Sequence, residues 1–120
     1  MSMSGRHIFL VDDEVMITKS LGLILSREGY QVSEFNDPLE ALERMKTTAP
    51  DLLISDVMMP QLSGVDLAIQ TRKARPECKI LLFSASTADL LKAARAAGHH
   101  FRFLQKPVHP PELLLELCQL

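Results

Sequence analysis

Hydrophobic residues along this chain fall into short apolar runs and longer segments with helical spacing. The short, β-rich runs occupy residues 7–11, 31–35, 51–55, 79–83 and 101–104, of which 31–35 alternates between polar and apolar residues, like a strand with one less-buried face. Between the first two runs, apolar residues recur at helical intervals: Ile17, Leu21, Ile24 and Leu25. This spacing places one apolar stripe on a helix. The pattern therefore predicts strands that alternate with helices.

Capping residues mark where several of the predicted helices begin. Asp37, Ser63 and Thr87 each precede a segment of helical period and can accept hydrogen bonds from the first turn. Gly98 can close the helix that Thr87 begins, and the last helix opens at Pro110. With the helix after the first strand, these signals predict five helices.

Strands that read as continuous apolar runs, each separated by a helix, indicate a parallel sheet covered on both faces. Right-handed crossovers leave few topologies for such a chain. We expect an α/β, doubly wound, flavodoxin-like fold, with five parallel strands in the order 2-1-3-4-5 and five helices. Residues 7–120 are expected to form this domain, and residues 1–6 a flexible leader.

The composition of the chain argues against several classes of function. The chain has 13 Lys and Arg against 15 Asp and Glu, and they are scattered, so direct nucleic-acid binding is not expected. No apolar run approaches the roughly 20 residues of a membrane span. Cys78 and Cys118 lie far apart without a C-x-x-C pattern, which favours reduced, packed thiols and a cytoplasmic protein.

Polar residues follow four of the five predicted strands. Asp12 and Asp13 follow the first, Asp56 the third and Ser84 the fourth, and the fifth runs into Lys106. In open parallel sheets, ligands bind beyond the carboxyl ends of the strands. We therefore expect these side chains to share one edge.

Three neighbouring carboxylates repel one another unless a cation lies between them. Mg²⁺ suits such a group, because it binds one or two carboxylates, waters and a phosphate oxygen. Asp56, on the central strand, is the best candidate for a nucleophile toward a phosphoryl group. Lys106 and Ser84 can bind the phosphoryl oxygens by charge and by hydrogen bonding.

Each feature also has an ordinary structural explanation. An Asp-Asp pair after a strand is often a helix cap, a serine that ends a strand is often a capping residue, and a Lys-Pro pair carries little information. The placement of all of them at the ends of four strands is what favours a functional site.

At these residues the sequence resembles the receiver domains of two-component response regulators. The similarity runs from about residue 7 to residue 117. The motifs that carry it are Val11-Asp12-Asp13-Glu14, Asp56-Val57-Met58-Met59-Pro60 with Gly64, Ser84-Ala85 and Lys106-Pro107.

The resemblance implies a role for each site residue. Asp56 is expected to be the phosphoacceptor. Asp12 and Asp13 correspond to the acidic pair that binds Mg²⁺ or Mn²⁺, with Asp13 the more direct ligand. The Asp56 carboxylate and the backbone carbonyl of Met58 are expected to complete the ligands that the protein supplies.

The resemblance also implies a switch. Ser84 corresponds to the switch hydroxyl, Phe103 to the switch aromatic and Ala85 to the small residue beside the phosphoryl group. The Lys106–Pro107 bond is expected to be cis. Phosphorylation would then change the face formed by the fourth helix, fifth strand and fifth helix.

The expected partners are a sensor histidine kinase or phosphotransfer protein and a downstream effector that the sequence does not identify. The chain is expected to be a phosphoacceptor that at most catalyses its own phosphorylation and dephosphorylation, not an enzyme. It could act alone or be an N-terminal piece of a longer regulator.

Three other classes of function share part of this pattern. An aspartyl-phosphate phosphatase of the haloacid-dehalogenase type needs a second Asp two residues after the nucleophile, where this chain has Met58. A nucleotide-binding domain lacks its glycine-rich loop after the first strand. A receiver-like interaction module that does not use phosphate remains the alternative, although the complete set of site residues disfavours it.

Overall fold

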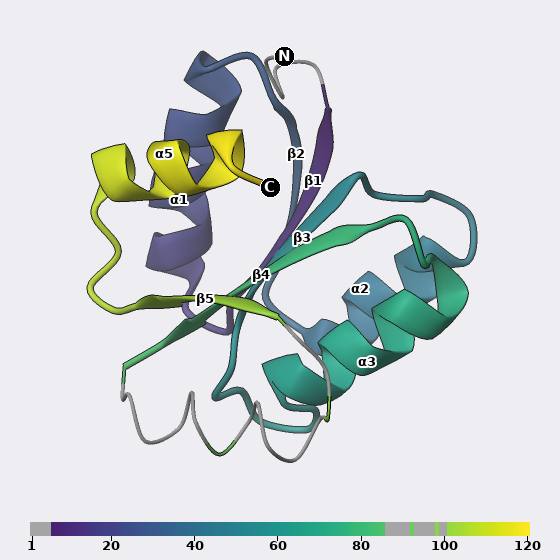
Figure 1. The fold of residues 1–120 in the computed structure, drawn as a ribbon. Helices are drawn as coiled ribbons and strands as arrows, with labels where there is room; N and C mark the ends of the chain where they lie inside the picture. The colour runs from purple at the N-terminus through teal and green to yellow at the C-terminus, as the bar shows by residue number, and fades with distance from the viewer. Residues whose placement is uncertain (1–5, 86–91, 93–97, 99–100) are drawn as a thin grey trace.

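Five parallel strands form one sheet at the centre of the protein (Figure 1). The computed structural model describes residues 6–85, 92, 98 and 101–120. The strands lie in the order β2-β1-β3-β4-β5. They are β1 (His7–Val11), β2 (Gln31–Phe35), β3 (Leu52–Asp56), β4 (Lys79–Ser84) and β5 (Arg102–Gln105). The predicted fold class and strand order are confirmed.

Helices cover both faces of this sheet. The described residues form α1 (Val15–Arg27), α2 (Pro38–Met45), α3 (Gly64–Ala74) and α5 (Pro110–Cys118). Figure 1 shows α1 and α5 on one face, and α2 and α3 on the other. The helix predicted between Thr87 and Gly98 falls largely outside the described residues, as does most of the predicted leader. Arg6, the last leader residue, accepts a backbone hydrogen bond from Gln31.

The two faces of the sheet bury separate apolar clusters. Ile8 and Leu10 of β1 pack with residues of α1 and α5, whereas Phe9 and Val11 pack with residues of α2 and α3. This division follows from the strand, in which successive side chains point to opposite faces. Because both faces are buried along the inner strands β1, β3 and β4, their sequences are mostly continuous apolar runs, whereas the edge strand β2 alternates.

The helix starts follow the predicted caps. The Asp37 side chain accepts a hydrogen bond from the backbone of Leu39, and the Ser63 side chain accepts one from Asp66. The two bonds satisfy backbone N–H groups that a helix start leaves without partners.

The limits of three strands differ from the prediction. β3 and β5 each begin and end one residue later than expected, and β4 extends one residue further, to Ser84. Asp56 is therefore the last residue of β3, and its register partner on β4 is Phe83. The backbone N–H of Val57 also donates to Phe83 O, at 2.8 Å. Strand pairing thus fixes the backbone at Asp56 directly.

Candidate functional site

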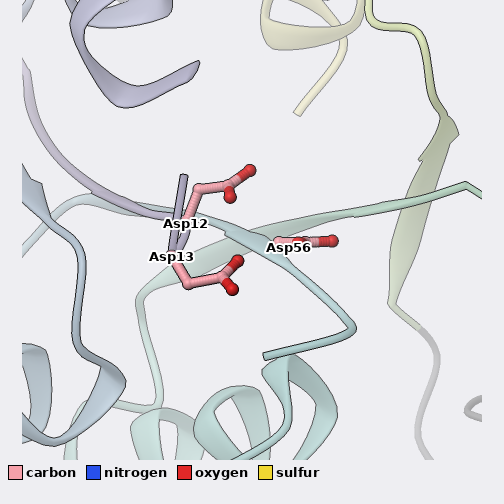
Figure 2. Close-up of side chains that lie close together, drawn as sticks. All are labelled: Asp12, Asp13 and Asp56. Atoms are coloured by element: carbon pink, nitrogen blue, oxygen red, sulfur yellow. The ribbon is translucent and has the colours of Figure 1, made fainter. Parts of the chain in front are cut away.

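Three carboxylates from two neighbouring strands meet at the carboxyl edge of the sheet. Asp12 and Asp13 directly follow β1, and Asp56 ends β3, which pairs with β1 in parallel register. Each offers an oxygen within 4.8 Å of the others. Figure 2 shows the three side chains gathered beyond the strand ends. The structure thus brings together the three acidic residues that the sequence predicted to be close.

The three carboxylates differ in their contact with solvent. Asp12 is 1% exposed and Asp56 is 5% exposed, whereas Asp13 is exposed. Burial raises the pKa of Asp12 above its ordinary value, and the nearby Asp56 charge adds to the effect. Burial also raises the pKa of Asp56, against the opposing influence of Lys106. Without another cation, the ionised forms of these two buried carboxylates are therefore disfavoured.

Lys106 supplies the positive charge at this edge. Its ammonium lies 3.2 Å from Oδ2 of Asp56 and 3.3 Å from Oδ2 of Asp12. Burial alone would lower the pKa of Lys106, but the two carboxylates outweigh it and raise the pKa. Lys106 follows β5, so the charged residues at this edge come from the ends of three different strands. The Lys106–Pro107 peptide bond is cis, as expected.

Ser84 and Phe103 lie on the two neighbouring strands at this side of the sheet. Ser84 is the last residue of β4 and is fully buried, and its carbonyl accepts a hydrogen bond from the Lys106 N–H at 2.7 Å. Ala85, the next residue, is exposed. Phe103 pairs in register with Leu82, two residues before Ser84, and is partly buried against the cluster on the α2 and α3 face.

The loop after Asp56 approaches the site closely. The side chain of Met58 is 61% exposed, and its backbone N–H donates to the Asp56 carboxylate. Gly64 donates its N–H to Val57 O at 2.9 Å. A Cβ atom at Gly64 would lie 1.9 Å from the backbone oxygen of Asp56. The start of α3 can therefore approach the end of β3 only with glycine at this position.

Sequence reasoning missed two polar residues beside the acidic group. The Asn36 amide donates to the backbone oxygen of Asp12 at 2.8 Å and to the Thr18 hydroxyl oxygen at 2.9 Å. An Asn after a strand is ordinarily a turn residue. Its partners lie 24 and 18 positions earlier in the chain. No local pattern could have indicated these contacts.

The acidic group suits a hard divalent cation. Its members are oxygen donors, and two of them are buried carboxylates whose ionised forms are disfavoured by burial. A divalent cation would remove that electrostatic penalty, and carboxylate oxygens are the ligands that Mg²⁺ prefers. One of the three, Asp13, faces solvent and leaves the group open to water and to a further ligand.

Comparison with known proteins agrees with this geometry. The family model described as the response regulator receiver domain matches residues 8–117. The chain belongs to this family. Receiver domains accept phosphoryl groups in two-component signal transduction, and phosphoacceptance by this domain fits the acidic group described above.

Curated relatives of this receiver domain include proteins of different lengths. The chemotaxis protein CheY of Thermotoga maritima is 30% identical over 113 residues, which cover 92% of each chain. The alkaline phosphatase synthesis transcriptional regulatory protein PhoP of Bacillus subtilis is 33% identical over 91% of this chain and 45% of its own length. The chain spans about half the length of the first such relatives.

Solved structures share the fold of this receiver domain over nearly its whole length. The receiver domain of an HD domain-containing protein from Pseudomonas fluorescens has a TM-score of 0.86 and 30% identity, covering 96% of this chain and 93% of that one. The chemotaxis protein CheY4 of Vibrio cholerae has a TM-score of 0.86 and 28% identity, covering 97% and 98%. Among the described residues, no helix is both long and apolar enough to cross a membrane.

Proposed function

We propose that this receiver domain accepts a phosphoryl group on the Asp56 carboxylate, with a divalent cation held beside it. The observation that carries the proposal is the group of three carboxylates at one edge of the sheet, two of which, Asp12 and Asp56, contact the Lys106 ammonium. Asp56 is the member that lies on the central strand β3. Pairing with Phe83 of β4 fixes its backbone, and the preceding residue, Ser55, pairs with Val11 of β1.

Asp12, Asp13 and Asp56 are the residues that would hold Mg²⁺ or Mn²⁺. Asp13, which is exposed, is proposed as the more direct ligand of the acidic pair, and the backbone carbonyl of Met58 as a further ligand. When bound, such an ion neutralises charge on the phosphoryl oxygens and orients the group for in-line transfer. The residues themselves supply oxygen ligands and the nucleophile.

In the proposed transfer, one carboxylate oxygen of Asp56 attacks the phosphorus atom of the donor. A phosphorus–oxygen bond forms at Asp56, and the bond between phosphorus and the donor breaks. The electron pair of that bond leaves with the donor, which is a histidine nitrogen in a kinase or phosphotransfer protein, or acetate when the donor is acetyl phosphate. The product is an acyl phosphate on Asp56.

Lys106, Ser84 and Ala85 are proposed to receive the phosphoryl oxygens. The Lys106 ammonium already lies beside Asp56 and can transfer its contact to a phosphoryl oxygen. The hydroxyl of Ser84 can donate to another oxygen. The small Ala85 side chain, at the exposed start of the loop after β4, leaves space for the group.

The phosphorylation signal is proposed to reach a partner through β5 and α5. A new dianionic group on Asp56 would draw the Ser84 hydroxyl toward the phosphoryl oxygens. The partly buried side chain of Phe103, on the neighbouring strand, could then move into the space that the hydroxyl leaves. Arg102 of β5 forms an ion pair with Glu116 of α5, so these elements are joined on the face that would change. The fourth helix of the proposed face lies outside the described residues.

The proposed partners are a sensor histidine kinase or phosphotransfer protein, which supplies the phosphoryl group, and a downstream effector protein or domain. The domain is proposed to act as a phosphoacceptor that at most assists its own phosphorylation and dephosphorylation. We propose the cytoplasm as its compartment, because Cys78 and Cys118 are both free thiols.

Incubation with acetyl phosphate, followed by intact-protein mass spectrometry, tests the proposal. We expect the mass of one phosphoryl group to be gained with Mg²⁺, but not with a chelator and not in Asp56→Asn. Asp51→Asn, at the opposite end of β3, is the matched control, because an amide oxygen can still accept the hydrogen bond from His7. It should gain the group as the native protein does.

Binding of beryllofluoride is the second measurement, because it does not depend on transfer from a phosphodonor. Beryllofluoride with Mg²⁺ imitates a phosphoryl group on a carboxylate. If the native domain neither gains a phosphoryl group nor binds beryllofluoride with Mg²⁺, the proposal is wrong. A receiver-like module that works without phosphate would then replace it.

A further inference from the structure

The loop that carries Asp12 and Asp13 is hydrogen-bonded to the end of the neighbouring strand β2. Asn36 lies between β2 and α2, and its amide donates to the backbone oxygen of Asp12 at 2.8 Å. The backbone N–H of Asp12 donates to Phe35 O at 3.1 Å. Both backbone polar groups of Asp12 are therefore bound to the end of β2, one by main chain and one by the Asn36 side chain.

The same amide also reaches the first turn of α1. It donates to the hydroxyl oxygen of Thr18 at 2.9 Å, and the Thr18 hydroxyl donates to the backbone oxygen of Val15 at 3.0 Å. Thr18 is fully buried. The chain of hydrogen bonds thus spans both ends of the loop between β1 and α1, from Asp12 to Val15.

Few other contacts hold this loop: the Lys106 ammonium lies 3.3 Å from Oδ2 of Asp12, and the Glu14 carbonyl accepts hydrogen bonds from the N–H groups of Ile17 and Thr18. Glu14 is the cap residue of α1, yet its side chain makes no capping hydrogen bond. Within the loop, the Glu14 N–H donates to Oδ1 of Asp12 at 2.9 Å. That bond uses one carboxylate oxygen of Asp12 and does not join the loop to another element. Asp13 lies between these two residues and is exposed, so its position depends on how firmly the loop is held.

We infer that Asn36 is a positioning residue for the divalent cation, acting through the backbone of Asp12 and through Thr18. The inference rests on the proposed function, because it concerns the same acidic group. Without the amide, the Asp12 carbonyl loses a partner and the loop can shift. The carboxylates of Asp12 and Asp13 would then have to be ordered when the ion binds, and affinity for the ion would fall.

Titration calorimetry with Mg²⁺ alone, on the unphosphorylated domain, provides the test. We expect Asn36→Ala to raise the dissociation constant for Mg²⁺ by about tenfold, the lower end of what is typical when the partner of a metal ligand is removed. Thr18→Val should weaken binding in the same direction, and Thr18→Ser, which keeps the hydroxyl, should restore it. If one chain of bonds is involved, the Asn36→Ala and Thr18→Val effects will not add.

Ser33→Ala is the matched control. Ser33 lies on β2, the strand that Asn36 follows, and forms a side-chain hydrogen bond of 2.8 Å with His7, the same length as the bond from Asn36 to Asp12. It lies away from the acidic group, so its loss should leave Mg²⁺ affinity unchanged. The melting temperature of each variant without Mg²⁺ separates lost stability from lost affinity.

Unchanged Mg²⁺ affinity in Asn36→Ala, with the native domain binding normally, would overturn the inference and leave the proposed function intact. A lower melting temperature with unchanged affinity would overturn it as well, since it would show a purely structural role. If Asn36→Ala fails to fold, the comparison of Thr18→Val with Thr18→Ser decides. If the native domain does not bind Mg²⁺, the proposed function falls and this inference falls with it.

Discussion

The Lys106 ammonium lies 3.2 Å from Oδ2 of Asp56, the carboxylate that we propose to be phosphorylated. It also lies 3.3 Å from Oδ2 of Asp12, so one cation is shared by two buried carboxylates. In this arrangement the Lys106 ammonium already neutralises part of the negative charge that a divalent cation would bind. The same side chain would therefore oppose metal binding before transfer and stabilise the phosphoryl group afterwards.

Replacement of Lys106 by methionine should separate these two effects. We expect Mg²⁺ affinity to increase by about tenfold, because roughly 1.4 kcal/mol of repulsion between neighbouring cations is removed. The rate of phosphorylation by acetyl phosphate at saturating Mg²⁺ should fall, because a phosphoryl oxygen loses its charged partner. Titration calorimetry and time-resolved intact mass measure the two quantities.

Lys79→Met is the control for the Lys106 variant. Lys79 is exposed at the other end of the sheet, where β4 begins, and should affect neither quantity. A parallel loss of Mg²⁺ affinity and rate in Lys106→Met would contradict the opposing roles proposed for this side chain.

The buried carboxylate of Asp12 should destabilise the metal-free domain at neutral pH. Its raised pKa, caused mainly by burial, means that the folded state binds a proton more strongly than the unfolded state does. Stability therefore decreases as the pH rises from the ordinary value of 3.8 through the raised pKa. Above that window, Asp12→Asn should melt a few degrees higher than the native domain.

Scanning calorimetry as a function of pH and Mg²⁺ checks the Asp12 prediction. The advantage of Asp12→Asn should shrink as the pH falls toward 3.8, where the native carboxylate is protonated. Mg²⁺ should stabilise the native domain more than the variant, because only the native protein keeps the full acidic group. A variant that melts lower than the native domain at neutral pH without metal would show that the Lys106 contact outweighs burial.

Gly64→Ala should damage the site through the backbone. The added Cβ would lie 1.9 Å from the Asp56 carbonyl oxygen, so the end of β3 or the start of α3 must move. We expect a loss of about 1–3 kcal/mol in unfolding free energy, as for other overpacked positions, together with weaker Mg²⁺ binding. Denaturant unfolding and titration calorimetry measure the two effects.

Gly98→Ala offers a useful contrast. Gly98 has a φ of +59°, so alanine is strained there, but its Cβ would meet nothing within 4 Å. This variant should lose stability without losing Mg²⁺ affinity. Equal Mg²⁺ affinity in Gly64→Ala and the native domain would contradict the close approach described for α3 and Asp56.

The two cysteines should react very differently with thiol reagents. Cys78 is 2% exposed, and burial raises its pKa to about 12, so its thiolate is scarce at neutral pH. Cys118 is exposed near the end of α5. We expect one fast-reacting thiol in the folded domain and two in denaturant. Cys118→Ser should remove the fast reaction, whereas rapid modification of both thiols in the native protein would contradict the packing of Cys78.

Much of the fold could be predicted because its signals are local. The apolar run that forms β1, the alternating segment that forms β2 and the caps Asp37 and Ser63 are each visible within a few residues, and the order of the strands follows from handed crossovers. The acidic group was also predictable, because Asp12, Asp13 and Asp56 follow strands whose ends must share an edge.

The features that could not be predicted depend on contacts between distant segments. The bond from Asn36 to Asp12 joins positions 24 apart, and nothing about an Asn after a strand identifies its partner. Similarly, the sharing of Lys106 between two carboxylates requires side-chain positions that no spacing gives. The limits of β3 and β5 and the end of β4 differ from the prediction by one residue, because strand limits depend on the pairing of neighbours.

The most direct test of the central claim is to locate the phosphoryl group. The domain would be phosphorylated with acetyl phosphate and Mg²⁺, reduced with borohydride, which converts an acyl phosphate on an aspartate to an alcohol, and digested for peptide mass spectrometry. The account predicts reduction at position 56, with the aspartates at positions 12 and 13 unchanged. Reduction at another aspartate, or equal phosphorylation of the Asp56→Asn variant, would contradict it.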